Sequence, residues 1–277
     1  MAVDEACAAD QVALSELRIA RGTVEARRAQ TLRRVPVFMP ALCRVRQGEK
    51  LLSWGEREAR AGANDVVLMP AGQELGVANL PGVHGYLAEV LSFSPALIAR
   101  FRTRHGSLVD SQLRAAPGAS LCVPLDVHAA LAWDQVMASL ADGAPAALQA
   151  HQVEGLLLAL ALAGHCGPLL MDRRDPLAAR VQQVMLLDPA ADWSVARVAG
   201  QLHLGASTLR RQLALEQRHF RDILEAVRLG RALQELQTGI LPISEIAALC
   251  GYASPSRFAA RFRQYHGLSP RALRATL

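Results

Sequence analysis

Two segments in the last third of the chain repeat one layout: a short helix, a tight turn and a second helix. The first reads SVARVAGQLHLGASTLRRQL (194–213) and the second reads ISEIAALCGYASPSRFAARF (243–262). Apolar residues recur at helical spacing on both sides of each turn. This layout is that of a helix-turn-helix motif, so the sequence predicts two such motifs in one all-α domain.

The residues at the turns support this prediction. Ala199 and Ala247 stand where the two helices of each motif cross at close range, and alanine has little side chain to keep them apart. Gly251 suits a turn with a positive φ, which other residues adopt only at a cost. In the second copy Ser254 can cap the next helix and Pro255 suits its first turn. We therefore expect the second helices of the motifs at 207–217 and 255–265.

Each of these second helices has one apolar and one polar face. Leu209 and Leu213 form the apolar stripe of the first, and Phe258 and Phe262 that of the second, so both stripes turn inward. The outward faces carry small polar groups and arginines. The guanidinium groups of these arginines can donate paired hydrogen bonds to guanine edges and to phosphates. The outward residues are Ser207, Thr208, Arg210, Arg211 and Gln212 in the first motif, and Ser256, Arg257, Ala260, Arg261 and Gln264 in the second. The alternative is that these arginines only solvate exposed helices, which explains one arginine well but two copies of the pattern poorly.

A long predicted helix, 220–237, joins the two motifs. A rigid joint would hold the two outward helices about 34 Å apart, which is one turn of a DNA duplex. Such a spacing would let both helices enter successive major grooves on one face of the duplex.

Positive charge is concentrated in the same domain. Residues 176–277 contain 13 arginines and 7 acidic residues, a net charge of +6, whereas residues 1–175 contain 17 basic and 18 acidic residues, a net charge of −1. Lys50 is the single lysine of the chain, so the preference for arginine is general, but its concentration in one domain is not. A localised basic surface typically binds nucleic acid, a membrane surface or an acidic partner.

The N-terminal part predicts a different fold, which makes the whole chain α+β. Residues 30–95 form short apolar or alternating runs between glycine turns, which is typical of a small antiparallel barrel or sandwich. Helices are expected at 94–106, 125–141 and 145–165. The helix 145–165 is apolar on more than one side, so we favour a partner subunit as its cover, with an internal core helix as the alternative.

The segment CGPLLMDRRDP (166–176) combines glycine, two prolines and a run of charges, which is typical of an interdomain linker. We therefore divide the chain into an N-terminal domain (1–166), a linker (167–176) and a C-terminal domain (177–277).

Composition points to a cytoplasmic protein. No apolar run approaches the roughly 20 residues that span a bilayer, and the first residues, MAVDEACAAD, lack the features of a secretory signal. The five cysteines are scattered and form no CxxC pair, which suits reduced thiols better than disulfides or a zinc site. We expect no membrane partner.

The C-terminal residues 177–274 resemble the DNA-binding domain of the AraC/XylS family of transcription regulators. The resemblance lies in TLRRQLALEQRHFRDILEAVRLGRALQEL (208–236) and in PISEIAALCGYASPSRFAARFRQYHGLSPRALR (242–274), including its Gly-x-Ser-Pro close. The LRRxL form is similar to the branch of the family that contains ToxT and Rns. The resemblance implies that Ser207, Arg210 and Arg211 contact DNA in the first motif, and that Pro255, Ser256 and Arg257 do so in the second.

The chain departs from the family pattern at five places. His203 and Gln217 occupy positions where the family usually has a small residue or glycine, His219 stands where it often has serine, and Gly205 replaces the usual serine cap. Ala260 stands where many relatives carry arginine. The first four departures bear on the first motif, and the last bears on base reading by the second motif.

The segment 42–79 resembles the cupin-type regulatory barrel that is common in this family. This weaker resemblance implies dimerisation helices and a small effector, whose site residues are unknown. The family also implies promoter DNA as partner, contact with RNA polymerase, and activation more often than repression. We expect a homodimer through the helix 145–165.

Two other functions compete with a regulator. A cupin-type small-molecule enzyme would need a metal-ligand set, but His84, His105 and His128 are isolated, so we assign no metal, no cofactor and no catalytic residue. A fused DNA repair methyltransferase would need a reactive cysteine in a Pro-Cys-His setting, which Cys166 lacks. We therefore expect a protein that is not an enzyme.

Overall fold

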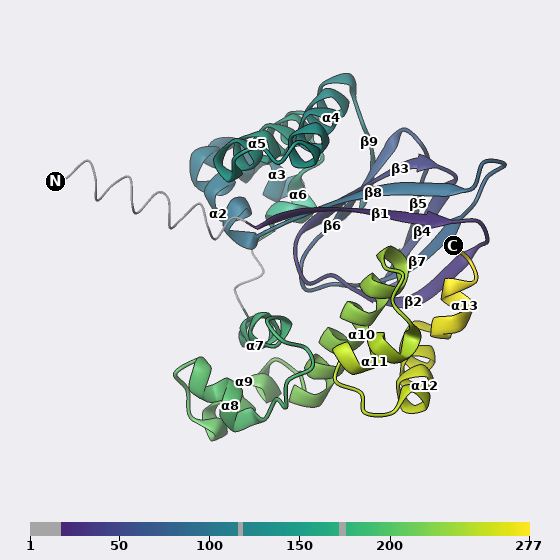
Figure 1. Cartoon of the computed structure of the whole chain (residues 1–277). Coiled ribbons are helices and arrows are strands. Elements are labelled where there is room, and N and C mark those ends of the chain that lie inside the picture. The colour runs from purple at the N-terminus through teal and green to yellow at the C-terminus, as the bar shows by residue number, and fades with distance from the viewer. Residues whose placement is uncertain (1–17, 116–118, 172–175) are drawn as a thin grey trace.

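The computed structural model describes residues 18–115, 119–171 and 176–277 (Figure 1). Strands and five helices make up its N-terminal part, and its C-terminal part is helical throughout. The predicted α+β class is therefore confirmed. In Figure 1 the C-terminal helices lie beneath the strands, on the side away from the N-terminal helices α4 (Val127–Ala141) and α5 (Ala146–Leu162).

The strands that the structure describes form two antiparallel sheets. One has the order β1-β8-β3-β6-β9 and the other β2-β7-β4-β5. Their inner faces share one apolar core, because alternate residues of a strand point to the same face. The strands are β1 (Ile19–Ala26), β2 (Gln30–Pro36), β3 (Ala41–Gln47), β4 (Glu49–Trp54), β5 (Arg57–Ala61), β6 (Asp65–Met69), β7 (Glu74–Leu80), β8 (Tyr86–Phe93) and β9 (Cys122–Pro124).

The sequence left open a barrel or a sandwich; the described strands form a sandwich, and the cupin-type barrel is not closed among them. Among the described strands no ladder joins one sheet to the other. The edge strands β5 and β9 approach each other but are only five and three residues long, and they form no pairing that could close the sheet. The arrangement is an open two-sheet sandwich.

The helix predicted at 145–165 is present as α5, and its own domain covers most of it. It packs against α4, α2 (Pro95–Arg104) and α3 (Gly106–Ala115), and Leu156, Leu157 and Leu160 are fully buried. Buried Glu154 fixes α5 to α2 through ion pairs of 2.6 Å with both Arg100 and Arg104. The internal-core interpretation therefore accounts for most of the apolar surface of this helix.

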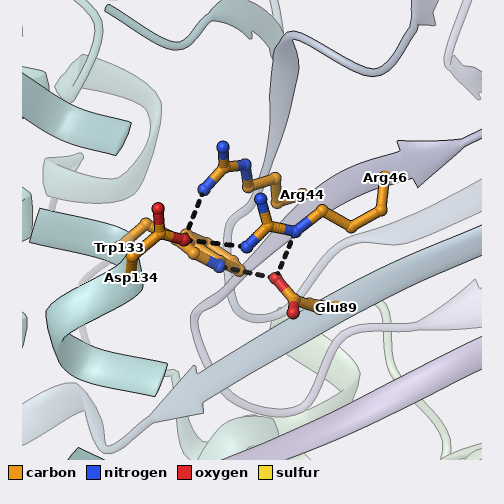
Figure 2. A network of polar contacts seen from close by, with 5 residues as sticks. All are labelled: Arg44, Arg46, Glu89, Trp133 and Asp134. Atoms are coloured by element: carbon orange, nitrogen blue, oxygen red, sulfur yellow. Dashed lines mark hydrogen bonds and ion pairs between the residues drawn. The ribbon is translucent and has the colours of Figure 1, made fainter. Parts of the chain in front are cut away.

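A polar network attaches α4 to the five-stranded sheet (Figure 2). Arg44 and Arg46 of β3 both donate to the Asp134 carboxylate, at 3.0 and 2.8 Å. Arg46 also donates to Glu89 of β8, and the same Glu89 oxygen accepts the Trp133 indole N–H at 2.9 Å. Trp133 is fully buried whereas Asp134 is exposed, so the Trp133–Glu89 bond is the part of the network that is shielded from water and fixes the direction of α4 on the sheet.

Residues 167–170, which lie in the segment predicted as a linker, form the short helix α6 (Gly167–Leu170). Its residues Leu169 and Leu170 belong to the N-terminal core. The rest of the predicted linker includes residues 172–175, which lie outside the described residues.

The C-terminal part follows the predicted helices to within one or two residues. Ser254 caps α12 by accepting a backbone N–H, as predicted, and Ser194 and Ser269 cap α8 and α13 in the same way. The helices are α7 (Leu177–Leu186), α8 (Val195–Gln201), α9 (Ala206–Leu215), α10 (Phe220–Thr238), α11 (Ile243–Leu249), α12 (Pro255–His266) and α13 (Pro270–Arg274).

The second helix-turn-helix unit is docked on the N-terminal sandwich. Leu32 of β2 is buried in the same apolar cluster as Phe258 and Phe262 of α12. His266 is fully buried, with Nδ1 2.6 Å from the Arg34 carbonyl oxygen and Nε2 3.2 Å from that of Leu229. In Figure 1 the yellow helices α12 and α13 accordingly lie beside β2.

Polar contacts at the same boundary fix the orientation of the second unit on the sandwich. The Arg34 guanidinium lies 4.3 Å from the centre of the Tyr265 ring, and both Arg34 and the Tyr265 hydroxyl donate to Glu74 of β7. Thr276, after α13, accepts a hydrogen bond of 2.8 Å from the buried Gln30 side chain. Gln30 in turn accepts one from Asn79, which also accepts one from Lys50. The buried polar chain therefore runs from inside the sandwich to the C-terminus.

The packing of α10 on the sandwich predicts a large effect of one methyl group. An added Cβ at Gly230 would lie 2.5 Å from Phe38 and 2.9 Å from Pro36. We expect Gly230→Ala to lower the free energy of unfolding by about 1–3 kcal/mol, since overpacking forces the helix outward. Gly155→Ala is the control, because it also lies inside a helix but its Cβ meets no atom within 4 Å. That change should raise stability by up to about 1 kcal/mol. Urea unfolding measures the free energy of unfolding of both variants. Equal changes in the two variants would contradict the close packing of α10 on the sandwich.

The buried histidine predicts a pH dependence. Burial lowers the pKa of His266 below its usual 6.5, although its contacts with the backbone of Arg34 and Leu229 act in the opposite direction. The unfolded chain then binds the proton more tightly, so the stability that neutral His266 supports is present above about pH 6.5 and is lost as the pH falls. Thermal unfolding between about pH 7.5 and 5 should show a smaller pH dependence for His266→Phe than for the wild type. An equal dependence would show that His266 titrates freely.

Candidate nucleic-acid interface

The first helix-turn-helix unit consists of α8 and α9. Val198 and Ala199 of α8 pack against Leu209 and Leu213 of α9, and all four are buried. The predicted outward residues Ser207, Arg210 and Arg211 are exposed, and Thr208 is half-buried. The structure therefore places the polar face of α9 in solvent, as the four-residue spacing of the leucines predicts.

The second unit consists of α11 and α12 and has an aromatic core. The Phe258 ring lies 5.4 Å from Tyr252 and 5.7 Å from Phe262, measured between ring centres. Both phenylalanines are fully buried. The predicted outward residues Pro255, Ser256, Arg257 and Arg261 are all exposed. Neither recognition face is turned into the protein.

The two units reach the same backbone geometry with different residues. In the second unit the turn and the end of α12 use Gly251 (φ 74°) and Gly267 (φ 85°). In the first unit the corresponding positive values fall on His203 (φ 56°) and Gln217 (φ 54°). These are two of the places where the sequence departs from the family pattern. Residues with a Cβ adopt this region at a cost of about 1–2 kcal/mol, so the first unit carries strain that the second lacks.

The outward arginines differ in their partners. Among the hydrogen bonds and ion pairs of the described residues, none involves the guanidinium of Arg210, Arg211 or Arg257. Arg261 is different, because its guanidinium donates to both carboxylate oxygens of Glu225 in α10, at 2.6 Å each. These bonds raise the pKa of Arg261. Three of these arginines therefore have an unpaired guanidinium among the described residues, and the guanidinium of Arg261 is paired with Glu225.

The helix α10 joins the two units and has 19 residues. Its residues Ile223 and Val227 are buried with the first unit, and Leu229 and Leu233 are buried with the second. In Figure 1 α8 and α9 lie beyond the lower end of α10, whereas α11 and α12 lie beside it. One continuous helix thus contributes to both cores.

Two side chains strengthen this joint, and the sequence pattern did not predict either. Arg228 of α10 donates to the carbonyl oxygens of Pro189 and Ala191, at 3.0 and 3.1 Å, and its guanidinium lies against Gly251 of the second turn. Glu216, at the end of α9, accepts the backbone N–H groups that begin α7, at 2.7 and 2.9 Å. Neither role has a local sequence signal, because each partner lies more than 20 residues away.

The histidines and cysteines of the described residues do not cluster. No group of three or more potential metal ligands occurs among them, and His84, His105 and His128 lie apart. Burial raises the pKa of Cys166 and Cys122 to about 12 and that of Cys250 to about 11, which suits inert thiols rather than nucleophiles. None of the described helices is long and apolar enough to cross a membrane.

Comparison with known proteins assigns the C-terminal domain. A family described as "Helix-turn-helix domain" matches residues 198–276. The transcriptional regulator SirC of Salmonella typhimurium (strain SL1344) is 35% identical over 98 residues, 35% of this chain and 33% of SirC. The HTH-type transcriptional regulator GadX of Escherichia coli (strain K12) is 35% identical over 107 residues, 38% of this chain and 39% of GadX. The C-terminal domain belongs to the AraC/XylS family.

The likeness of this chain to solved structures extends beyond the C-terminal domain. The fold of apo ToxT from Vibrio cholerae strain SCE256 matches with a TM-score of 0.68, and the match covers 94% of this chain and 97% of ToxT at 16% identity. The two-part architecture is therefore shared with ToxT. In sequence, however, the chain spans little more than a third of the length of the curated relatives named above.

The contrast between the two turns predicts opposite effects of matched substitutions. His203→Gly and Gln217→Gly should each raise the free energy of unfolding by about 0.5–1 kcal/mol, because relief of strain exceeds the added entropy of the unfolded chain. Gly251→Ala and Gly267→Ala should each lower it by more than about 1 kcal/mol, since each new Cβ would also meet an arginine side chain within 3 Å. Chemical unfolding of the four variants measures these changes. A loss of stability in both glycine-gaining variants would contradict the assigned strain.

Proposed function

We propose that this protein is a cytoplasmic, sequence-specific DNA-binding transcription regulator that acts as an activator. One observation carries the proposal: two helix-turn-helix units present arginine-bearing helices to solvent and are both built around α10. The match of the C-terminal domain to regulators of the AraC/XylS family supports it.

In the proposed complex α9 and α12 each enter a major groove of promoter DNA. Two grooves on one face of a duplex are about 34 Å apart, and a continuous helix between the units keeps a fixed spacing that a flexible linker would lose. Arg210, Arg211 and Arg257 have the free forks that suit phosphates and guanine edges. The small residues of the two helices lie close to the DNA backbone in this complex; they are Ser207, Thr208, Pro255 and Ser256.

The N-terminal sandwich is proposed as a cupin-like regulatory and dimerisation domain. Although the core of its own domain covers most of α5, Leu148 and Leu162 remain 47% and 72% exposed, and Val127 and Leu131 of α4 are 65% and 59% exposed. These four residues form the surface that we propose to contact a second copy. RNA polymerase is a further proposed partner of the promoter-bound protein.

A small effector is the proposed signal for the N-terminal domain. ToxT, whose fold this chain shares over most of its length, has been solved with an unsaturated fatty acid bound. The side chain contacts between the sandwich and α12 offer a route by which a ligand could change how the DNA-binding domain is held.

The proposal predicts how charge removal affects binding to promoter DNA. Arg211→Ala and Arg257→Ala should each weaken specific binding at least about 10-fold in mobility-shift titrations, because each removes an arginine from a groove. The dependence of affinity on salt should also become less steep, by about one unit of slope for each phosphate that is no longer neutralised.

Arg57→Ala is the matched control, since Arg57 is an exposed arginine of β5 in the N-terminal sheet. Its binding should equal that of the wild type. Unchanged specific binding by both recognition-face variants would rule out the assigned faces.

A further inference from the structure

Arg261 is held in place before any DNA is present. Its Nε and Nη2 atoms donate to the two carboxylate oxygens of Glu225, at 2.6 Å each, and its Nη1 atom donates to the Gln264 side chain at 2.8 Å. Glu225 belongs to α10, whereas Arg261 and Gln264 belong to α12. A residue of the joining helix therefore sets the orientation of a side chain on the recognition helix.

The donors that remain suit one base. A guanidinium has five N–H groups, and these contacts use three of them. One N–H is left on each terminal nitrogen. In the major groove guanine presents two acceptors side by side, N7 and O6, and a bidentate arginine is their commonest partner. Two free donors on adjacent nitrogens match these two acceptors.

The carboxylate also changes which acceptor Arg261 favours. A guanidinium paired with a carboxylate has little net charge left, so it gains less from a phosphate than a free arginine does. Its hydrogen-bonding geometry is unchanged, so it still suits a neutral base edge. The free guanidinium groups of Arg210, Arg211 and Arg257 keep their full charge and have no such preference for a base edge over a phosphate. Arg261 is thereby the outward arginine best suited to reading a base.

The ion pair between Arg261 and Glu225 contributes little to the stability of the fold. The side chains of Arg261 and Glu225 are 44% and 22% exposed, and pairs at this exposure contribute little to folding. A guanidinium that is already held in place loses less conformational entropy on binding, and this increases its contribution to the affinity for DNA. The neighbouring residue Ala260 is exposed and has only a methyl group, so it leaves room for a base pair to approach Arg261.

We propose that Glu225 is a positioning residue that aims Arg261 at a guanine in the major groove. The base preference of the second helix-turn-helix unit at that position is then set by a side chain of α10, outside the recognition helix. This inference rests on the proposed function, because it assumes that α12 enters the groove.

The first experiment selects binding sites for the full chain from a pool of random DNA duplexes. The wild type should enrich a site in which one position is almost always guanine. Arg261→Ala and Glu225→Gln should both lose this preference and keep the others, with a fall in discrimination of about 5- to 100-fold for Arg261→Ala and a smaller fall for Glu225→Gln. Glu225→Gln is nearly isosteric, so folding should be retained.

Glu235→Gln is the matched control for this selection. Glu235 also pairs with an arginine of α10, Arg231, at 2.5 Å, but Arg231 and Glu235 both lie on α10 and neither is bonded to α12. This variant should select the wild-type site. If Glu225→Gln keeps the guanine preference that Arg261→Ala loses, the positioning role is refuted. If Arg261→Ala relaxes no position, base reading by Arg261 is refuted.

The second experiment changes the DNA and uses Arg261→Ala as the control protein. Replacing the selected guanine by 7-deazaguanine removes the N7 acceptor, and wild-type affinity should fall at least about 5-fold. Arg261→Ala should show no such fall. Unchanged wild-type binding would overturn the proposal. Failure of the wild type to enrich any sequence would instead count against the proposed function, so the two failures are distinguishable.

Discussion

The packing of α10 is the constraint on which the rest of the C-terminal domain depends. Its 19 residues contribute to two apolar cores, one for each helix-turn-helix unit. Neither core is complete without it, since each unit has only two short helices and a few flanking residues. Arg228 adds a second connection by bonding the loop before the first unit while it lies against the turn of the second. The two recognition helices are therefore fixed relative to each other by packing as well as by chain continuity.

The two units are not equivalent in their surroundings. The second shares its core with Leu32 of the sandwich, and the buried His266 and Thr276 bond to the N-terminal strands. The first unit has fewer contacts of this kind and carries positive φ angles at His203 and Gln217. A change in the sandwich would thus reach the second unit through Leu32 and His266, and the first through Phe38, which packs at the margin of its core, and through α10. This asymmetry gives the N-terminal domain a physical means of influencing DNA binding.

The sequence predicted the C-terminal domain well because the deciding signals there are local. Ser254 and Pro255 mark the start of α12, and the paired leucines and phenylalanines mark the inward faces. It did not predict α3, the open edges of the sandwich, or the docking of α12 on β2. Those features depend on residues far apart in the sequence that are buried in one cluster, such as Leu32 and Phe262, and no spacing along the chain encodes them. The partner of Arg261 was missed for the same reason, because Glu225 lies 36 residues away.

Hydroxyl-radical footprinting of the full chain on a single-site promoter fragment tests the central claim most directly. A fixed pair of recognition helices predicts two protected patches on one face of the duplex, centred about 10–10.5 base pairs apart. The separation should not vary between sites of different sequence. One protected patch, or two patches on opposite faces of the duplex, would contradict a rigid joint through α10.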